Sequence, residues 1–209
     1  MLSNKKNKMD DELFKKIKLH QEWLESFGNS GYQICLEDAD LTGLELSEIN
    51  LTQAILPGVK FDGANLSQVD FYSANLASAS FEEANLTKAN LTKANLDYAF
   101  LHNAILNNAQ ALKASFVEVD MSGADLTNSN LRDTYFLEAN LDNSILCGAD
   151  INGATLQAIS LCGSDLRGLK GIDTLRSKWI YIGSKESIFR LEGDQIYEWL
   201  ISAAKENIN

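Results

Sequence analysis

Apart from Ala111, the sequence carries a large apolar residue at every fifth position from Leu36 to Leu166, and the register never slips. Of the 27 positions in this phase, 24 are Leu or Phe, and Ala111 is the one small residue. A helix repeats its buried face every 3.6 residues and a half-buried strand every two, so a period of five fits neither element. The pattern predicts a repeat architecture in which one residue in five points inward and the chain turns a corner after it.

Three further phases of the five-residue register have their own composition. Two residues before the inward position Ala recurs, which suits a second, tighter interior site, and one residue before it Asn and Asp recur. Between residues 34 and 168 every Gly lies two residues after an inward position. A corner needs a residue that accepts positive φ at such a place, as at the third residue of a type II turn. Pro57-Gly58 is the preferred central pair of that turn.

The tandem motif A-[D/N]-L-x-x resembles that of the pentapeptide-repeat proteins, for example at Ala64-Asn65-Leu66, Ala84-Asn85-Leu86 and Ala124-Asp125-Leu126. The resemblance covers about two thirds of the chain. It implies an all-β solenoid, a right-handed quadrilateral β-helix with four pentapeptides per coil. Residues twenty apart would then stack at the strand spacing of about 4.8 Å, and about seven coils would form a rod roughly 30 Å tall.

We expect three parts: an N-terminal capping helix and lead-in over 1–33, the β-helix over 34–168, and a C-terminal hairpin-helix cap over 169–209. Such caps would cover the open edges of the first and last coils. Both flanks resemble those of many bacterial pentapeptide-repeat proteins.

The two caps rest on local patterns in the flanks. Apolar residues at helical spacing predict a helix over 10–27 that stops at Gly28; they are Leu13, Phe14, Ile17, Trp23, Leu24 and Phe27. Residues 179–182 and 187–191 predict a hairpin joined by 183–186. A final helix follows, for which Asp194 is the expected cap.

The sequence also bears on location. It has no stretch near 18 apolar residues, so we expect neither a transmembrane helix nor a membrane partner. The basic residues 1–6 are followed by acidic ones rather than by an apolar run, which is not the pattern of a signal peptide. We therefore expect a cytoplasmic protein in which Cys35, Cys147 and Cys162 are isolated free thiols.

Catalytic patterns are missing from the sequence. Its two histidines are His20, on the expected N-terminal helix, and His102, at a corner where we expect contact with Glu82 one coil earlier. Neither a phosphate-binding G-x-x-x-x-G-K loop nor a calcium-binding D-x-[DN]-x-[DN]-G loop is present. General acid-base or nucleophilic chemistry needs titratable groups that converge in a concave site. We expect no enzyme activity, no cofactor and no metal.

Charge is the more informative feature. Acids outnumber bases 18 to 6 between residues 34 and 168, while the two flanks are nearly neutral. Such a surface does not predict direct nucleic-acid binding; it serves solubility or a basic partner. In the four-sided arrangement the acids that gather are, on one side, Asp62, Glu82 and Glu83 and, on another, Glu118 and Glu138.

The resemblance implies one specific partner, because some pentapeptide-repeat proteins protect DNA gyrase by imitating B-DNA. Two features argue against that role. Four bases, Lys88, Lys93, Lys113 and Arg132, interrupt the negative potential in the middle of the rod. The unbroken register also leaves no room for the projecting loops of the quinolone-resistance members.

A second possible surface is apolar. Tyr98, Val117, Tyr135 and Leu137 are expected to point outward and to form a contiguous patch. The patch is either an interaction or homodimer surface or the mark of an irregular coil near Ala111. The sequence therefore favours a non-enzymatic scaffold for protein-protein interaction, with a DNA mimic that binds gyrase or another type II topoisomerase as the alternative.

Overall fold

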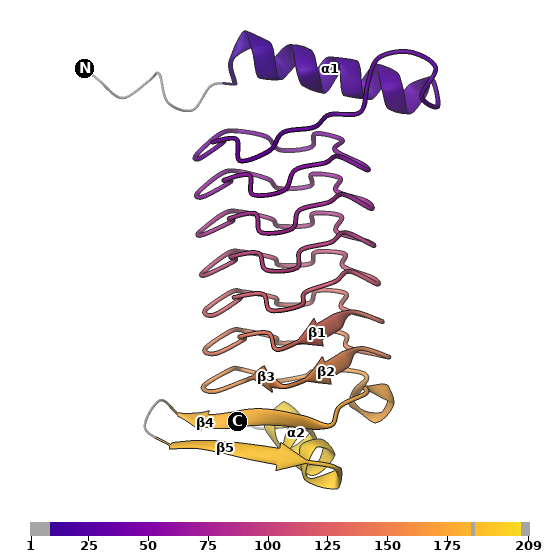
Figure 1. Cartoon of the computed structure of the whole chain (residues 1–209). Helices are drawn as coiled ribbons and strands as arrows, with labels where there is room; N and C mark the ends of the chain where they lie inside the picture. Colours follow the sequence, from indigo (N-terminus) through magenta and orange to yellow (C-terminus); the bar gives the residue numbers. More distant parts are fainter. Residues whose placement is uncertain (1–8, 185–186, 206–209) are drawn as a thin grey trace, which may run out of the picture.

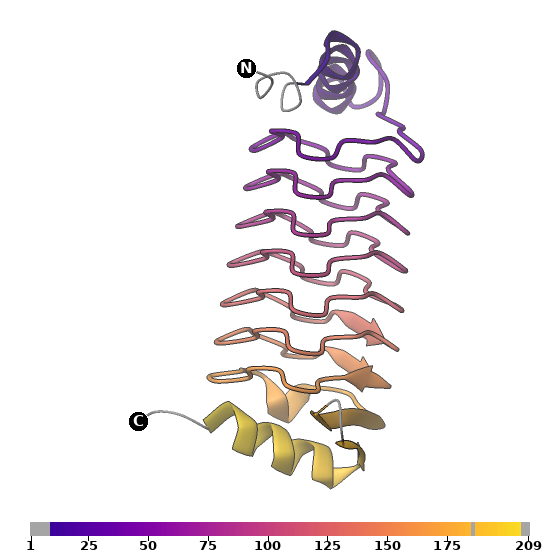
Figure 2. The ribbon, with the colours of Figure 1, turned by 90° about the vertical axis from the view of Figure 1, so that its left-hand side faces the viewer.

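The structure, a computed structural model, describes residues 9–184 and 187–205. The chain forms a column of stacked coils, with α1 across one end and β4, β5 and α2 at the other (Figures 1 and 2). The elements in chain order are α1 (Asp11–Glu25), β1 (Tyr135–Leu137), β2 (Thr155–Gln157), β3 (Ile159–Ser160), the 3-10 helix η1 (Ile172–Thr174), β4 (Trp179–Ser184), β5 (Ser187–Glu192) and α2 (Asp194–Lys205).

The coils are joined by parallel bridges between residues twenty apart, from Cys35↔Ile55 to Asp150↔Lys170. Each coil therefore contains four pentapeptides, as the resemblance implied. The amide of Leu86 donates to the carbonyl of Ile105 over 2.7 Å, and the amide of Ile105 donates back to Ala84 over 2.9 Å. Because this pattern repeats along the column, neighbouring coils satisfy most of each other's backbone groups.

We name the four sides of the column by the inward residues of one coil. Side A contains Leu96, side B Leu101, side C Leu106 and side D Ala111, and the other coils follow at intervals of twenty residues. Each side is one pentapeptide wide, from two residues before the inward residue to two residues after it. The sides follow one another around the coil, so side B lies between A and C.

The interior matches the sequence pattern. The inward Leu and Phe residues between Leu46 and Leu166 are at most 5% exposed, and the Ala residues two positions earlier are at most 1% exposed. Ala111 is buried as well, and Gln110 next to it bridges both Asn90 and Asn130. The ladder is therefore regular at this point, which contradicts an irregular coil near Ala111.

The predicted corner position is confirmed. Every residue two positions after an inward residue, from Asp38 to Gly168, has positive φ. Most of these corners are not Gly: Glu83 has φ 57° and Tyr98 has φ 62°.

The Asn and Asp residues before the inward position have a hydrogen-bonding role. The amide just after the inward residue has no backbone partner in the ladder, and the Asx side chain two residues earlier accepts from it. Asn85 Oδ1 accepts from the Thr87 amide over 3.0 Å, and Asp70 Oδ1 from the Tyr72 amide over 2.9 Å. Pro57 has no amide hydrogen, and the residue two before it is Ile55 rather than Asn or Asp.

Helix α1 begins as expected and packs less broadly than expected. Asp10 caps it by accepting from the Leu13 amide over 2.7 Å, and the amide of Gly28, at φ 85°, donates back to the Trp23 carbonyl. Leu13, Ile17 and His20 are buried. Phe14 and Phe27, expected on the apolar face, are 61% and 94% exposed.

The C-terminal hairpin and helix are present, with small differences from the prediction. Strands β4 and β5 pair antiparallel, and β4 also pairs parallel to β3. The expected connection includes Lys185 and Glu186, which lie outside the described residues, as does the N-terminal stretch 1–6. Asp194 is the first residue of α2 rather than its cap. None of the helices in 9–184 and 187–205 is long and apolar enough to span a bilayer.

Candidate functional site

Charge is distributed unequally over the four sides. Sides A and B carry eleven acidic residues and one base, Lys60, whereas sides C and D carry seven acidic residues and five bases. Because A and B are adjacent, the negative charge is concentrated on one half of the column. The bases that interrupt the potential lie on the opposite half, where Lys93, Lys113 and Arg132 belong to side D and Lys88 to side C.

Many of the aspartates are engaged in the backbone structure. Those before an inward residue accept from the amide two residues on, as Asp120 does from Ser122 over 3.0 Å. Others act across coils. Asp62 accepts from the hydroxyl of Ser80 and from the Glu82 amide, which is 3.1 Å away. Asp97 does the same for Ser115 and Val117, and Asp142 for Ser160 and Cys162.

This cross-coil contact replaces a missing Asx side chain. Where the residue before the inward position is Ser80, Ser115 or Ser160, an aspartate from the preceding coil accepts from the amide that Asn or Asp would otherwise serve. Asp62 was predicted to belong to an acidic interaction surface. The structure shows that its side chain accepts hydrogen bonds from Ser80 and from the Glu82 amide of the next coil, at the corner that it shares with Glu82.

The four glutamates of the predicted surface are different. Within the described part of the chain, Glu82, Glu83, Glu118 and Glu138 form no side-chain hydrogen bond and no ion pair. Glu82 and Glu83 lie at the corner between sides B and C, and Glu118 and Glu138 lie at the corner between A and B. The two predicted groups therefore flank side B from its two edges.

The predicted apolar patch meets the acidic surface. Leu137 accepts through its carbonyl from the Glu118 amide over 2.7 Å, and Val117 accepts in the same way from Tyr98 over 2.8 Å. Tyr98 thus shares the A–B corner with Glu118 and Glu138, while Tyr135, 53% exposed, lies on side A. The acidic and apolar patches, treated separately from sequence, are parts of one surface.

Phe100 is a member of this surface that the sequence analysis did not assign. It lies on side B, bridged to Ser80 on one side and to Asp120 on the other, and it is 49% exposed. The available signal was its phase, because Phe100 occupies a position where Asn, Asp or Ser usually stands. We define the AB surface as eight residues that lie on side B or at its two corners: Tyr98, Phe100, Val117, Leu137, Glu82, Glu83, Glu118 and Glu138.

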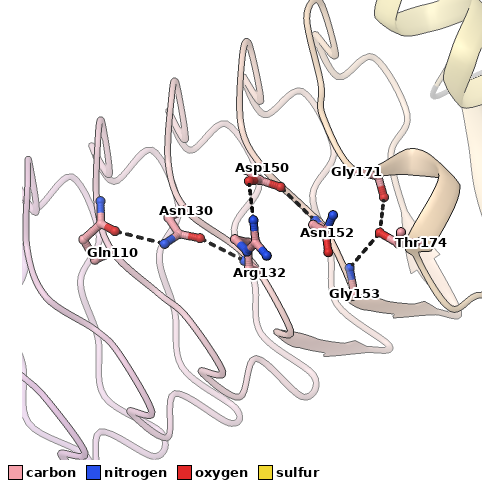
Figure 3. Close-up of polar contacts among 8 residues, drawn as sticks. All are labelled: Gln110, Asn130, Arg132, Asp150, Asn152, Gly153, Gly171 and Thr174. Atoms are coloured by element: carbon pink, nitrogen blue, oxygen red, sulfur yellow. Dashed lines mark hydrogen bonds and ion pairs between the residues drawn. The ribbon is translucent and has the colours of Figure 1, made fainter.

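On side D, in contrast to the glutamates of the AB surface, several polar side chains are paired (Figure 3). Asn130 donates to Gln110 over 3.0 Å, and Arg132 Nη1 lies 3.5 Å from Asp150 Oδ2. Asp150 in turn accepts from the Asn152 amide, and Thr174 of η1 accepts from the Gly153 amide over 3.1 Å. Several polar groups on side D are thus paired, most of them from coil to coil.

The histidines and cysteines are the remaining candidate groups named from the sequence. Among 9–184 and 187–205, no set of three His, Cys, Asp or Glu residues is placed to hold a metal. His102 contacts Ser122 over 2.9 Å and Asn103 over 3.0 Å, rather than the expected Glu82. The three cysteines are free thiols, and burial raises the pKa of Cys147.

A cleft of about 490 Å³ lies between the last side C segment and α2, lined by Asp165, Arg167, Trp199 and Ser202 among others. Its charged groups are paired with each other, since the Arg167 guanidinium donates to both oxygens of Asp165. This hydrogen bonding lowers the pKa of Asp165 to about 2. Among its described lining residues, the cleft therefore has no unpaired charged side chain.

Comparisons with known proteins agree with the repeat. The family described as "Pentapeptide repeats" matches in 8 copies, over residues 34–71, 70–108, 101–133 and 129–168. A search of curated proteins finds no match.

Among solved structures, the chain is similar to a pentapeptide repeat protein of the Arabidopsis thaliana thylakoid lumen, with 34% identity over 47% of this chain and 69% of that one and a TM-score of 0.46. It is also similar to HetL of Nostoc sp. strain PCC 7120, a protein involved in heterocyst differentiation regulation. The identity is 26% over 75% of this chain and 90% of HetL, and the TM-score is 0.32. A third similar structure is QnrB1, a plasmid-mediated fluoroquinolone resistance protein. The identity is 16% over 70% of this chain and 92% of QnrB1, and the TM-score is 0.29.

Proposed function

We propose that this chain, which belongs to the pentapeptide-repeat family, is a non-enzymatic scaffold that docks the AB surface onto a basic surface of a partner protein. The observation that carries the proposal is the segregation of charge, with eleven acidic residues and one base on sides A and B. Because their side chains are unpaired within the described structure, Glu82, Glu83, Glu118 and Glu138 are free to meet a partner's Lys and Arg.

In this proposal the rest of the chain supports the docking surface. The rod of about seven coils over 34–168 is right-handed and holds the four glutamates in fixed columns. The flanks 1–33 and 169–209 cover the ends, which supports a rod that does not stack end to end. The free thiols of Cys35, Cys147 and Cys162 support a reducing compartment, and we place the protein in the cytoplasm.

An octa-lysine peptide tests the proposal, because it offers positive charge and little else. We expect salt-sensitive binding by the folded protein, measured by isothermal titration calorimetry at two salt concentrations. Changing Glu82, Glu83, Glu118 and Glu138 together to Gln should abolish it. The matched control removes the same number of charges elsewhere, through Glu45→Gln, Glu48→Gln, Asp133→Asn and Glu198→Gln. Equal loss in both variants would contradict the proposal.

DNA gyrase, or another type II topoisomerase, is a second candidate partner, supported by charge spacing. The net charge of about ten on sides A and B, over a rod of roughly 30 Å, gives about one charge per 3 Å. One strand of duplex DNA carries one per 3.4 Å. The acidic side thus has nearly the linear charge density of a single DNA strand.

A gyrase supercoiling assay with the protein titrated in, with and without a quinolone, tests this candidate. DNA mimicry predicts salt-sensitive inhibition or drug protection that the four Glu→Gln changes remove and the matched control retains. An assay in which the protein has no effect would exclude gyrase and leave the docking proposal to the octa-lysine experiment.

A further inference from the structure

Two partly exposed aromatic rings of this protein are covered by cations of the same chain. On side D, Lys93 Nζ lies 5.1 Å from the centroid of the Tyr72 ring and also donates to its hydroxyl over 2.7 Å. In the C-terminal hairpin, the Arg190 guanidinium lies 4.7 Å from the Trp179 ring. In both places the chain covers a ring with its own cation, an arrangement that electrostatic attraction to the ring face favours.

The rings of the AB surface have no such cover. Tyr98 is 51% and Phe100 49% exposed, and within the described residues neither ring contacts a cation or another ring. The charge distribution gives the reason, because the only base on sides A and B is Lys60. Lys60 belongs to the column of Phe100 but stands two coils away from it.

Carboxylates stand next to these uncovered rings. Glu118, near Tyr98, is unpaired within the described residues, whereas Asp120, near Phe100, accepts from the Ser122 amide and from Asn140. Glu118 follows Tyr98 in its column at one coil's distance, and Phe100 is bridged to Asp120. Glu82 and Glu83 lie at the far edge of the same side. An aromatic centre bordered by charged residues is the arrangement found in protein-protein interfaces, where a few buried aromatic residues carry most of the binding energy.

A second copy of the chain does not suit this surface. Two copies meeting through the same patch in a two-fold dimer would bring Glu118 and Glu138 of one close to the equivalent glutamates of the other. Like charges at such a contact cost free energy. The complement that fits is cationic.

We infer that the AB surface recognises arginine side chains of a partner protein, with Tyr98 and Phe100 as the anchoring rings and the four glutamates as the pairing groups. The inference rests on the proposed docking function and deepens it. A guanidinium is planar, is weakly hydrated, stacks on aromatic faces and pairs with carboxylates through two parallel hydrogen bonds. A lysine ammonium is a compact, strongly hydrated charge and gains less from the rings.

The experiment compares octa-arginine with octa-lysine peptides on the full chain. We expect octa-arginine to bind at least about fivefold more tightly, the range of a cation–π contact at each ring. The double change Tyr98→Ser and Phe100→Ser should remove that preference and leave octa-lysine affinity unchanged. The matched control is Ile105→Ser with Ile145→Ser, two half-exposed apolar residues of side C in the same phase as Phe100. It should keep the preference.

The outcomes separate the two proposals. Equal affinity of the two peptides, with loss of both on the four Glu→Gln changes, overturns arginine recognition and supports acidic docking. Binding that is insensitive to the four Glu→Gln changes overturns the docking function itself. A preference for arginine that persists in the Tyr98 and Phe100 double variant also contradicts the inference, provided that its circular dichroism and thermal unfolding match those of the unchanged protein.

Discussion

Sides B and D are built on the same interior and the same ladder, and they differ in what they present outward. Side D balances its charges, covers Tyr72 with Lys93 and pairs Arg132 with Asp150. Among the residues that the structure describes, Glu82 and Glu83 of side B have no partner, and Phe100 is half-exposed with no cation at its ring. In a repeat whose inward phases are fixed by packing, the outward phases are free to differ, and they are where a binding surface can be encoded.

The largest expected effect comes from substitutions in the interior, which sides B and D share, so we expect the same result on both sides. Phe81 on side B and Leu91 on side D are both fully buried. Phe81→Asp and Leu91→Asp each place an unpaired carboxylate among apolar side chains, so each should cost more than about 4 kcal/mol and unfold the rod. Circular dichroism and thermal unfolding measure this. A folded variant with unchanged melting would refute the inward assignment of that position.

A smaller effect distinguishes an aspartate that hydrogen-bonds to the next coil from a glutamate at the same corner that has no partner among the described residues. Asp62→Ala leaves the Glu82 amide and the Ser80 hydroxyl without their acceptor, at an expected cost of about 1–3 kcal/mol. Glu83→Ala, at the same corner, should change the free energy of unfolding by less than about 0.5 kcal/mol. Urea unfolding compares the two, with Asp62→Asn as the control that keeps a side-chain oxygen. Equal costs would mean that Asp62 does not support the ladder.

The pH dependence of stability tests the end of the column rather than its sides. His20 is buried, and its Nδ1 accepts from the Ile34 amide over 3.1 Å. Burial lowers the pKa of His20 from 6.5, opposed by a nearby backbone group of Thr52. The unfolded chain therefore binds the proton first, and stability should fall as the pH drops below about 6.5. Thermal unfolding between pH 7.5 and 5.5 should show this loss, and His20→Gln should remove it, whereas the exposed-site control His102→Gln should retain it.

The smallest effects concern single surface charges. We expect changes of opposite sign in the free energy of unfolding when a paired charge and an unpaired charge are removed. Arg132→Gln on side D breaks an exposed pair with Asp150 and should cost between 0 and about 1 kcal/mol. Glu118→Gln relieves repulsion with the stacked Glu138 and should stabilise by a few tenths of a kcal/mol. Low-salt urea titrations can resolve the signs. Destabilisation by Glu118→Gln would indicate an internal partner for that carboxylate.

The sequence predicted the inward phases, the small interior Ala phase and the positive-φ corners, because packing and backbone sterics act on each pentapeptide alone. It did not distinguish Asp62 from Glu83, since that difference depends on a serine of the next coil, eighteen residues along the chain. It also treated the acidic and apolar residues as separate surfaces. The four-pentapeptide coil that the resemblance implies already places Tyr98 near Glu118, whereas Phe100 was assigned to neither predicted surface.

The side of the column that meets a basic ligand can be measured directly by following backbone amide NMR signals during titration with octa-lysine. We predict that the signals of Glu82, Glu83, Phe100, Glu118 and Glu138 shift on addition of the peptide until the site is saturated, while those of Asn130 and Arg132 on side D do not shift. Shifts of equal size on both sides would contradict a single docking surface.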